Sequence, residues 1–333
     1  MAKESGIALV LTLLVITILC VMVVEFNYLM RVDISIAANI RDENRAFYIA
    51  KAGVNAAIAI LRKDDNNFDA PSEDWGKFAE LTRIPSIYSE YLGEGNITVG
   101  IADKSGKINV NKITDENSVR SEQLRKLIDL LEIDAESIEG IVDSIIDWVD
   151  PNDDPQPMGA EDDFYQGTED PYPCRDAPLE TVSELLMVKG ITEDIFYGTK
   201  EKEGIKDFLT VHSKGKININ TADPLVLQTL CYWKEADDEW SFPITKEIAE
   251  NIVEIRGEEV FEKESDLKEK VDDISEEIYK KIHNQITVST KFFSIDAVGE
   301  VNMAEKRISA IISRGPERRG EGRVMKVVYW AVE

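Results

Sequence analysis

The chain has 333 residues, with 64 Asp and Glu against 38 Lys and Arg, and its formal net charge is −26. A chain of this length can form two or three domains, each with a hydrophobic core of its own. The strong negative charge repels nucleic acid, whose binding needs clustered cations, so we expect no nucleic-acid partner. It suits cation binding, or solubility outside the cytoplasm.

The first feature along the chain is an uncharged apolar run from Ile7 to Val24. As a helix, a run of this length just spans a hydrocarbon core of about 30 Å. It does not resemble an ordinary secretory signal peptide, because its basic region is only Lys3 and no A-x-A-like cleavage site follows it. We therefore expect a membrane helix that the protein retains.

Helical periodicity continues beyond this run. The apolar positions that recur every three or four residues are Ala46, Ile49, Ala50, Gly53, Val54, Ala57, Ile60 and Leu61. The polar stretch "KDDNNFDAPSED" ends the pattern near Lys63. The sequence predicts one helix over 7–63, whose transmembrane half is 7–24 and whose second half packs on a domain through one face.

Two short segments of the central region repeat each other. "SGKINVN" at 105–111 recurs as "KGKININ" at 214–220, each with a glycine turn and a short alternating strand. Short amphipathic helices follow both copies, and their tight turns resemble helix-hairpin-helix units. Because the second unit is rich in glutamate, we expect these helices to pack against each other and not to bind DNA.

Strand patterns flank this helical region. Ile97, Val99 and Ile101 alternate on one side, and residues 286–333 contain the other strands. The predicted fold class is α+β, a long N-terminal helix packed on an antiparallel sheet. We expect residues 64–112 and 286–333 to form this domain, and residues 113–285 to form an inserted all-α domain of helix-hairpin-helix or SAM-like type.

The densest group of titratable side chains lies in residues 147–170, which we call the acidic segment. Its carboxylates are Asp147, Asp150, Asp153, Asp154, Glu161, Asp162, Asp163, Glu169 and Asp170. Oxygen ligands at irregular spacing on a loop suit Ca²⁺, although the EF-hand spacing is missing. A solvated acidic loop explains the composition as well, so the residues alone leave both interpretations open.

The cysteines and the remaining motifs add little chemistry. A disulfide between Cys174 and Cys231 is an option in an oxidising compartment, but the sequence does not place the two thiols together. There is no nucleophile elbow, Walker loop or CxxC motif, and neither histidine sits in a metal or triad pattern. We expect a protein that is not an enzyme.

The N-terminus resembles that of type IV pilin-like proteins. In "MAKESGIALVLTLL", Gly6 matches the last residue of their leader and Ile7 the first residue after it. The resemblance implies that residues 1–6 are a leader, that a prepilin peptidase cuts after Gly6, and that the amine of Ile7 is methylated. Most pilins have Glu at the fifth position after the cut, where this chain has Leu11. That departure is typical of the K-type minor pseudopilins of type II secretion.

The acidic segment is also similar to that of K-type pseudopilins, in "DWVDPNDDPQPMGAEDDFY". By resemblance it binds calcium, and we expect the ligands to be Asp150, Asp154, Glu161, Asp162 and Asp163. The family implies a single-pass protein of the inner membrane with a periplasmic C-terminal domain. It implies a place at the pseudopilus tip, with the I- and J-type minor pseudopilins and the major pseudopilin as partners in protein export across the outer membrane.

Two other functions remain in view. One is a minor pilin of a type IV pilus or competence system, acting in adhesion or DNA uptake. The other is a membrane-anchored, calcium-dependent hydrolase.

Overall fold

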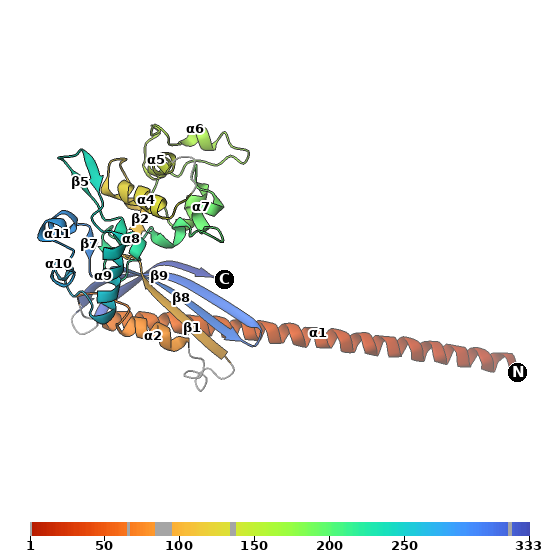
Figure 1. Cartoon of the computed structure of the whole chain (residues 1–333). Helices are drawn as coiled ribbons and strands as arrows, with labels where there is room; N and C mark the ends of the chain where they lie inside the picture. Colours follow the sequence, from red (N-terminus) through yellow and green to blue (C-terminus); the bar gives the residue numbers. More distant parts are fainter. Residues whose placement is uncertain (1, 65–66, 84–94, 134–137, 319–321) are drawn as a thin grey trace.

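The structure is a computed structural model that describes residues 2–64, 67–83, 95–133, 138–318 and 322–333. A single helix, α1 (Ala2–Lys63), forms its longest element. The C-terminal part of α1 lies along one face of a sheet, and the N-terminal part extends far beyond it (Figure 1).

The second half of α1 packs through the predicted face. Ala46, Ala50, Val54, Ala57 and Leu61 have no exposed surface. The helix approaches the sheet closely, since a Cβ on Gly299 would lie 2.1 Å from the backbone oxygen of Ala46. Only glycine fits there, so this position fixes how near α1 and the sheet come.

The apolar first part of α1 packs against nothing in the chain. Ile7 and Val24 are each 70% exposed, and the apolar side chains between them are similarly bare. By length and composition α1 can cross a membrane. An exposed apolar surface of this extent indicates a lipid or protein environment for residues 7–24.

The sheet has the strand order β1-β8-β9-β10, and every neighbouring pair is antiparallel. The strands are β1 (Gly95–Asp103), β8 (Phe292–Val301), β9 (Ala304–Arg318) and β10 (Gly322–Val332). Gly95 pairs with Val301 and Asp103 with Phe293, so all of the chain between β1 and β8 is an insertion into this sheet. The α+β prediction, with the C-terminal strands completing the sheet, is confirmed.

A short helix, α2 (Asp74–Thr82), lies beside β1. Its Trp75 packs edge-on against Phe293, with ring centroids 5.5 Å apart. The Thr82 hydroxyl accepts a hydrogen bond of 2.9 Å from the backbone N–H of Val99. These contacts join α2 to the core between α1 and the sheet.

The insertion is mainly helical and has its own hydrophobic core. Its α-helices are α4 (Val119–Leu130), α5 (Ile138–Val149), α6 (Asp162–Tyr165), α7 (Glu193–Tyr197), α8 (Pro224–Gln228), α9 (Lys246–Glu258), α10 (Asp266–Lys270) and α11 (Glu276–Ile282). Its 3-10 helices are η2 (Val110–Lys112), η3 (Val182–Met187) and η4 (Ile205–Phe208). The insertion leaves the sheet at the end farther from the N-terminus (Figure 1).

Short strand pairs accompany these helices, and two of the strands, at residues 108–109 and 217–218, lie in the repeat copies where the sequence predicts them. The pairs are β2 (Ile108–Asn109) with β3 (Leu209–Thr210), β4 (Ile217–Asn218) with β7 (Ile286–Thr287), and β5 (Tyr232–Lys234) with β6 (Glu239–Ser241). The buried residues of the insertion run from Ile108 to Val288, because β2 and β7 belong to its core. The core therefore extends slightly beyond the expected limits of 113 and 285.

The sequence repeat has a structural counterpart. Asn111 of the first copy bonds with both the N–H and the C=O of Leu179, at 2.8 and 2.9 Å. Asn220 of the second copy does the same with Phe261, at 3.0 and 2.9 Å. In each unit the second asparagine of the K-I-N-x-N motif thus fixes a distant backbone segment, which supports two related units.

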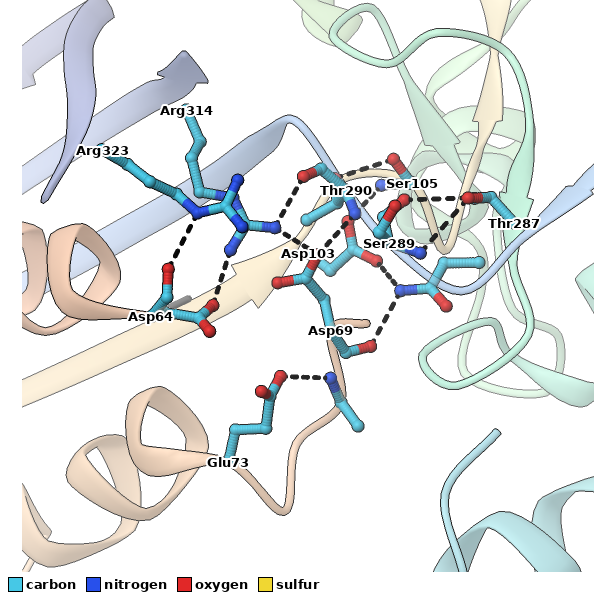
Figure 2. A network of polar contacts seen from close by, with 12 residues as sticks. Asp64, Asp69, Glu73, Asp103, Ser105, Thr287, Ser289, Thr290, Arg314 and Arg323 are labelled. Carbon is cyan, nitrogen blue, oxygen red and sulfur yellow. Dashed lines mark hydrogen bonds and ion pairs between the residues drawn. The ribbon is translucent and has the colours of Figure 1, made fainter. Parts of the chain in front are cut away.

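A buried polar network joins the insertion to the sheet, and we call it the junction network (Figure 2). The guanidinium of Arg314, on β9, donates to Asp64 at 2.6 Å, to Asp69, and to the backbone oxygen of Thr290 at 2.9 Å. The N–H of Thr290 donates to Asp69 at 2.6 Å. Burial raises the pKa of Asp69 to about 7, although Arg314 acts in the opposite direction.

A second carboxylate of the junction network is Asp103, at the end of β1. It accepts hydrogen bonds from the side chains of Asn218, at 2.8 Å, and Thr221, at 2.6 Å. Both donors belong to the second repeat copy and the segment after it, so the network connects β1 directly to the insertion. Burial raises the pKa of Asp103 as well.

Candidate functional site

The acidic segment begins on α5, which carries two buried carboxylates. Asp147 accepts hydrogen bonds from the backbone N–H of Gln156, at 3.0 and 3.2 Å to its two oxygens. One turn earlier, Asp143 accepts from the N–H of Met158 at 3.0 Å. These bonds hold the loop after α5 against the helix, because the spacing of four residues places both carboxylates on one helix face.

The loop comes very close to α5 at one glycine. A Cβ on Gly159 would lie 1.9 Å from a carboxylate oxygen of Asp147, so a larger residue would displace the loop. The ammonium of Lys189 donates to the backbone oxygens of Gly159, at 2.8 Å, and Met158, at 3.2 Å. Both contacts fix the position of the backbone immediately before Glu161.

Glu161 is a buried carboxylate in this region, and no cation of the described chain compensates its charge. It is 6% exposed, and neither of its oxygens has a hydrogen-bond partner among the described residues. Burial raises the pKa of Glu161 to about 7, the negative charges of Asp147 and Asp150 act in the same direction, and the neighbouring Cys174 thiol acts in the opposite one. Leaving a buried carboxylate without a donor is costly, and a bound cation would remove that cost.

Asp176 lies beside Glu161 and was not among the expected ligands. Its Oδ1 is also buried without a partner, and the ligand atoms of Glu161, Cys174 and Asp176 lie within 4.8 Å of one another. Asp176 follows the acidic run that ends at Asp170, so composition alone did not single it out. Its position two residues after Cys174 was the available signal.

Cys174 contributes a thiol that a hard cation does not use. Burial raises its pKa to about 12, so the sulfur stays protonated at neutral pH. Its backbone N–H donates to Asp162 at 2.6 Å, which ties α6 to the segment that carries Asp176. The oxygen atoms nearby therefore suit Ca²⁺ or another oxygen-preferring cation better than a thiolate-binding metal.

The other expected ligands differ in exposure. Asp150 is half-buried and accepts from the N–H of Asn152 at 3.1 Å. Asp162 is half-buried, whereas Asp154 and Asp163 are exposed. The structure thus brings Glu161 together with Asp176 and with the charges of Asp147 and Asp150, and it leaves Asp154 and Asp163 at the surface.

The structure holds the two cysteines of the insertion as separate buried thiols, without the disulfide that the sequence left open. Cys174 lies 3.8 Å from the backbone oxygen of Asp147 on α5. Cys231 lies 3.9 Å from the backbone oxygen of Val119 on α4. The two sulfurs pack against different helices, which is why no bridge forms in this arrangement.

The positions that the pilin resemblance singles out lie at the far end of α1. The helix runs without interruption through Gly6, Ile7 and Leu11. Ile7 is 70% exposed and Leu11 is 61% exposed. Both are therefore available to a membrane or to neighbouring helices.

Comparisons with known proteins agree with these features. A sequence model of the family "Type II secretion system (T2SS), protein K" matches residues 106–198. The type II secretion system protein K of Pseudomonas aeruginosa is 26% identical over 332 aligned residues, which cover 97% of this chain and 92% of that protein. The protein K of Klebsiella pneumoniae is 25% identical, over 58% of this chain and 60% of that protein.

A solved structure has the same fold. It is the GspK-GspI-GspJ complex from the type 2 secretion system of enterotoxigenic Escherichia coli, one chain of which matches with a TM-score of 0.64 and 17% sequence identity. The match covers 89% of this chain and 99% of that one. Together with the relatives and the matched family region, it shows that the chain is similar to the type II secretion system K proteins in sequence and in fold.

Proposed function

We propose that this chain is a minor pseudopilin at the tip of the pseudopilus, where it starts assembly with the I- and J-type minor pseudopilins. The observation that carries the proposal is the position of the insertion. It leaves the sheet at the end farthest from the apolar part of α1 (Figure 1). A bulky domain at that end blocks the addition of another subunit above it, while α1 below stays free to pack with partners.

Leu11 supports the same position in the fibre. In the pilin family the usual Glu neutralises the terminal amine of the subunit ahead. A first subunit has no subunit ahead, and an unpaired carboxylate in a bilayer costs roughly 2.5–3.5 kcal/mol on insertion scales. An apolar side chain avoids that cost, and Leu11 is fully apolar and exposed on α1.

The same proposal fixes the location and processing of the chain. Residues 7–24 anchor it once in the inner membrane, and the domain after α1 lies in the periplasm. A prepilin peptidase cuts after Gly6 and methylates the new terminus at Ile7, and the major pseudopilin then extends the fibre below. The protein works by association and not by catalysis.

Calcium is the cation we propose for the acidic segment. Glu161 and Asp176 are the ligands that this geometry favours, because their buried oxygens lack donors among the described residues. Asp162, which accepts from the N–H of Cys174, and Asp150, whose charge acts on Glu161, are further candidate ligands. We propose that the exposed Asp154 and Asp163 serve at most through water. Bound Ca²⁺ would neutralise the carboxylates and fix the loop between α5 and η3.

The decisive experiment for the tip proposal is co-purification with candidate I- and J-type partners from a detergent extract. We expect a stable complex of the three proteins that forms without the major pseudopilin. A variant with Leu11→Glu introduces the unpaired carboxylate, and Leu11→Ile is its matched control. Pseudopilus initiation that is unchanged by Leu11→Glu, or a failure of the three proteins to associate, would contradict the proposal.

The calcium proposal has its own test. Isothermal titration of the full chain in detergent, after chelator treatment, measures Ca²⁺ binding directly. We expect binding in the parent, and strong weakening in Glu161→Gln and in Asp176→Asn. No binding in the parent would sink the calcium assignment and leave the tip proposal untouched.

A further inference from the structure

A cavity of about 590 Å³ opens beside the junction network, between the insertion and the sheet. Its lining includes Lys214, Lys216, Lys291, Arg314 and Arg323, and the described part of the lining contains no Asp or Glu. The whole chain has 64 acidic residues against 38 Lys and Arg. A cavity lined in this way is unusual for such an acidic protein, and it attracts anions locally.

The cations reach the cavity from both parts of the molecule. Lys214 and Lys216 flank the glycine turn of the second repeat copy, just before β4. Lys291 lies on the segment that returns from β7 to β8, and Arg323 lies on β10. An anion in this cavity would therefore contact the insertion and the sheet at once.

Acidic groups of the described chain pair with Arg314 but not with the three lysines of the cavity lining. Arg314 is already paired with Asp64 and Asp69, so it offers little charge to a ligand (Figure 2). Within the described chain Lys214, Lys216 and Lys291 form no ion pair, and Lys291 also lies 5.8 Å from the ring centroid of Phe292. Three ammonium groups are thus left to meet a ligand.

Hydroxyl groups complete the lining. Ser105, Thr287, Ser289 and Thr290 all face the cavity. The hydroxyls of Ser105 and Thr290 bond to each other at 2.7 Å, and the hydroxyl of Thr287 donates to the backbone oxygen of Ser289. The hydroxyl of Ser289 makes no hydrogen bond to another described residue. Ammonium and hydroxyl donors around one space are the groups that bind phosphate oxygens.

We propose that this cavity binds a free phosphate or a soluble phosphate monoester. A phosphate monoester carries a charge of about −1.5 to −2 with three acceptor oxygens, which matches several cations better than one carboxylate does. The volume leaves room for a small organic group beside the phosphate. The ligand bridges the insertion and the sheet and so fixes their relative position.

The headgroups of the anchoring membrane are too far away to be the source. From Val24 to Lys63 α1 continues as one helix, which separates the apolar segment from the cavity by about 60 Å. The ligand is therefore a soluble anion and not a lipid of the bilayer that holds residues 7–24. This inference does not depend on the tip assignment.

The test is a calorimetric titration of the full chain in a non-ionic detergent with chelator present, so that calcium phosphate does not interfere. The ligands are inorganic phosphate, glycerol 3-phosphate and the diester glycerophosphoglycerol, with chloride matched for ionic strength. We expect the first two to bind and the diester to bind about tenfold more weakly. Equal binding of the diester would overturn the assignment, as would no binding of phosphate above chloride.

Variants locate the site. The triple variant Lys214→Gln, Lys216→Gln and Lys291→Gln should bind phosphate at least about tenfold more weakly, because charge-assisted hydrogen bonds are lost. The matched control replaces the exposed Lys200, Lys246 and Lys263 by Gln, with the same change of net charge. We expect it to bind within about twofold of the parent. Equal weakening in both triples would show a general charge effect and would overturn the proposal.

Discussion

The protein buries carboxylates in two places and treats them in opposite ways. In the junction network Asp69 and Asp103 meet Arg314, Asn218 and Thr221 of the same chain. Glu161 in the acidic segment and Asp176 just after it have buried oxygens without a donor among the described residues. One oxygen of Asp69 also lacks a partner, but Arg314 supplies the counter-charge of Asp69. No described cation pairs with Glu161, so the difference indicates that the acidic segment needs a cation from solution.

The largest change in the free energy of unfolding should come from removing the guanidinium of Arg314. In Arg314→Met, Asp69 loses its counter-charge while remaining buried, and breaking a buried pair in this way costs about 3–5 kcal/mol. Chemical unfolding of the full chain in detergent at pH 8, followed by near-UV circular dichroism, measures the loss. Arg307→Met on the same strand is the control, since Arg307 is about half exposed and should change stability by less than ~0.5 kcal/mol.

If Arg314→Met proved no more destabilising than Arg307→Met, the junction would not be held by this ion pair. The contrast between the two buried acidic regions would then disappear.

Calcium removal should give the next largest effect, and it tests the other region. Ligand binding stabilises the folded state by about 2.7 kcal/mol at a free concentration one hundred times the dissociation constant. We expect chelation to lower the free energy of unfolding of the parent by about this amount. In Glu161→Gln that calcium-dependent increment should vanish.

Without calcium, the stability changes caused by the two variants, each relative to the parent, should differ in sign. Without calcium, Glu161→Gln removes an unbalanced buried charge, so the variant should be at least as stable as the calcium-free parent. Arg314→Met, by contrast, is less stable in every buffer. A large loss of stability in calcium-free Glu161→Gln would mean that this carboxylate has an internal partner after all.

The pH dependence should give a smaller effect, centred on Asp69. Its folded-state pKa of about 7 lies above the ordinary value of 3.8, so the folded protein holds a proton that the unfolded chain releases. The free energy of unfolding therefore falls as the pH rises between about 4 and 7. Asp69→Asn cannot titrate, and its stability should fall less over this range. Equal slopes in the two proteins would contradict the assignment.

The parts of the fold that depend on local pattern were predictable from sequence. The spacing of Ala46, Ala50, Val54 and Leu61 predicts the buried face of α1, because helix geometry repeats every 3.6 residues. The strands at both ends of the insertion follow from alternation, and so does the expectation that they share one antiparallel sheet. The pairing of β1 with β8 is seen only in the structure.

Contacts across long separations were not predictable. Arg314 and Asp69 are 245 residues apart, and their meeting depends on the register of β9 and on where α1 ends. Asp176 joins Glu161 only because Asp162 holds the backbone of Cys174. Composition located the acidic segment but could not rank its members, since burial decides which carboxylates lack partners.

The smallest predicted effect concerns an acidic residue that the sequence favoured as a ligand. Asp163 lies on α6 next to Asp162, yet its side chain is exposed. Water solvates its charge, so Asp163→Asn should change the free energy of unfolding by less than about 0.5 kcal/mol. Its Ca²⁺ affinity should stay close to that of the parent, whereas Asp176→Asn should lose most of the affinity. Calorimetric titration of both variants measures the two affinities. A large loss of Ca²⁺ affinity in Asp163→Asn alone would mean that calcium is bound at the surface of α6. The exposure of a carboxylate would then no longer distinguish calcium ligands from the other acidic residues of the segment.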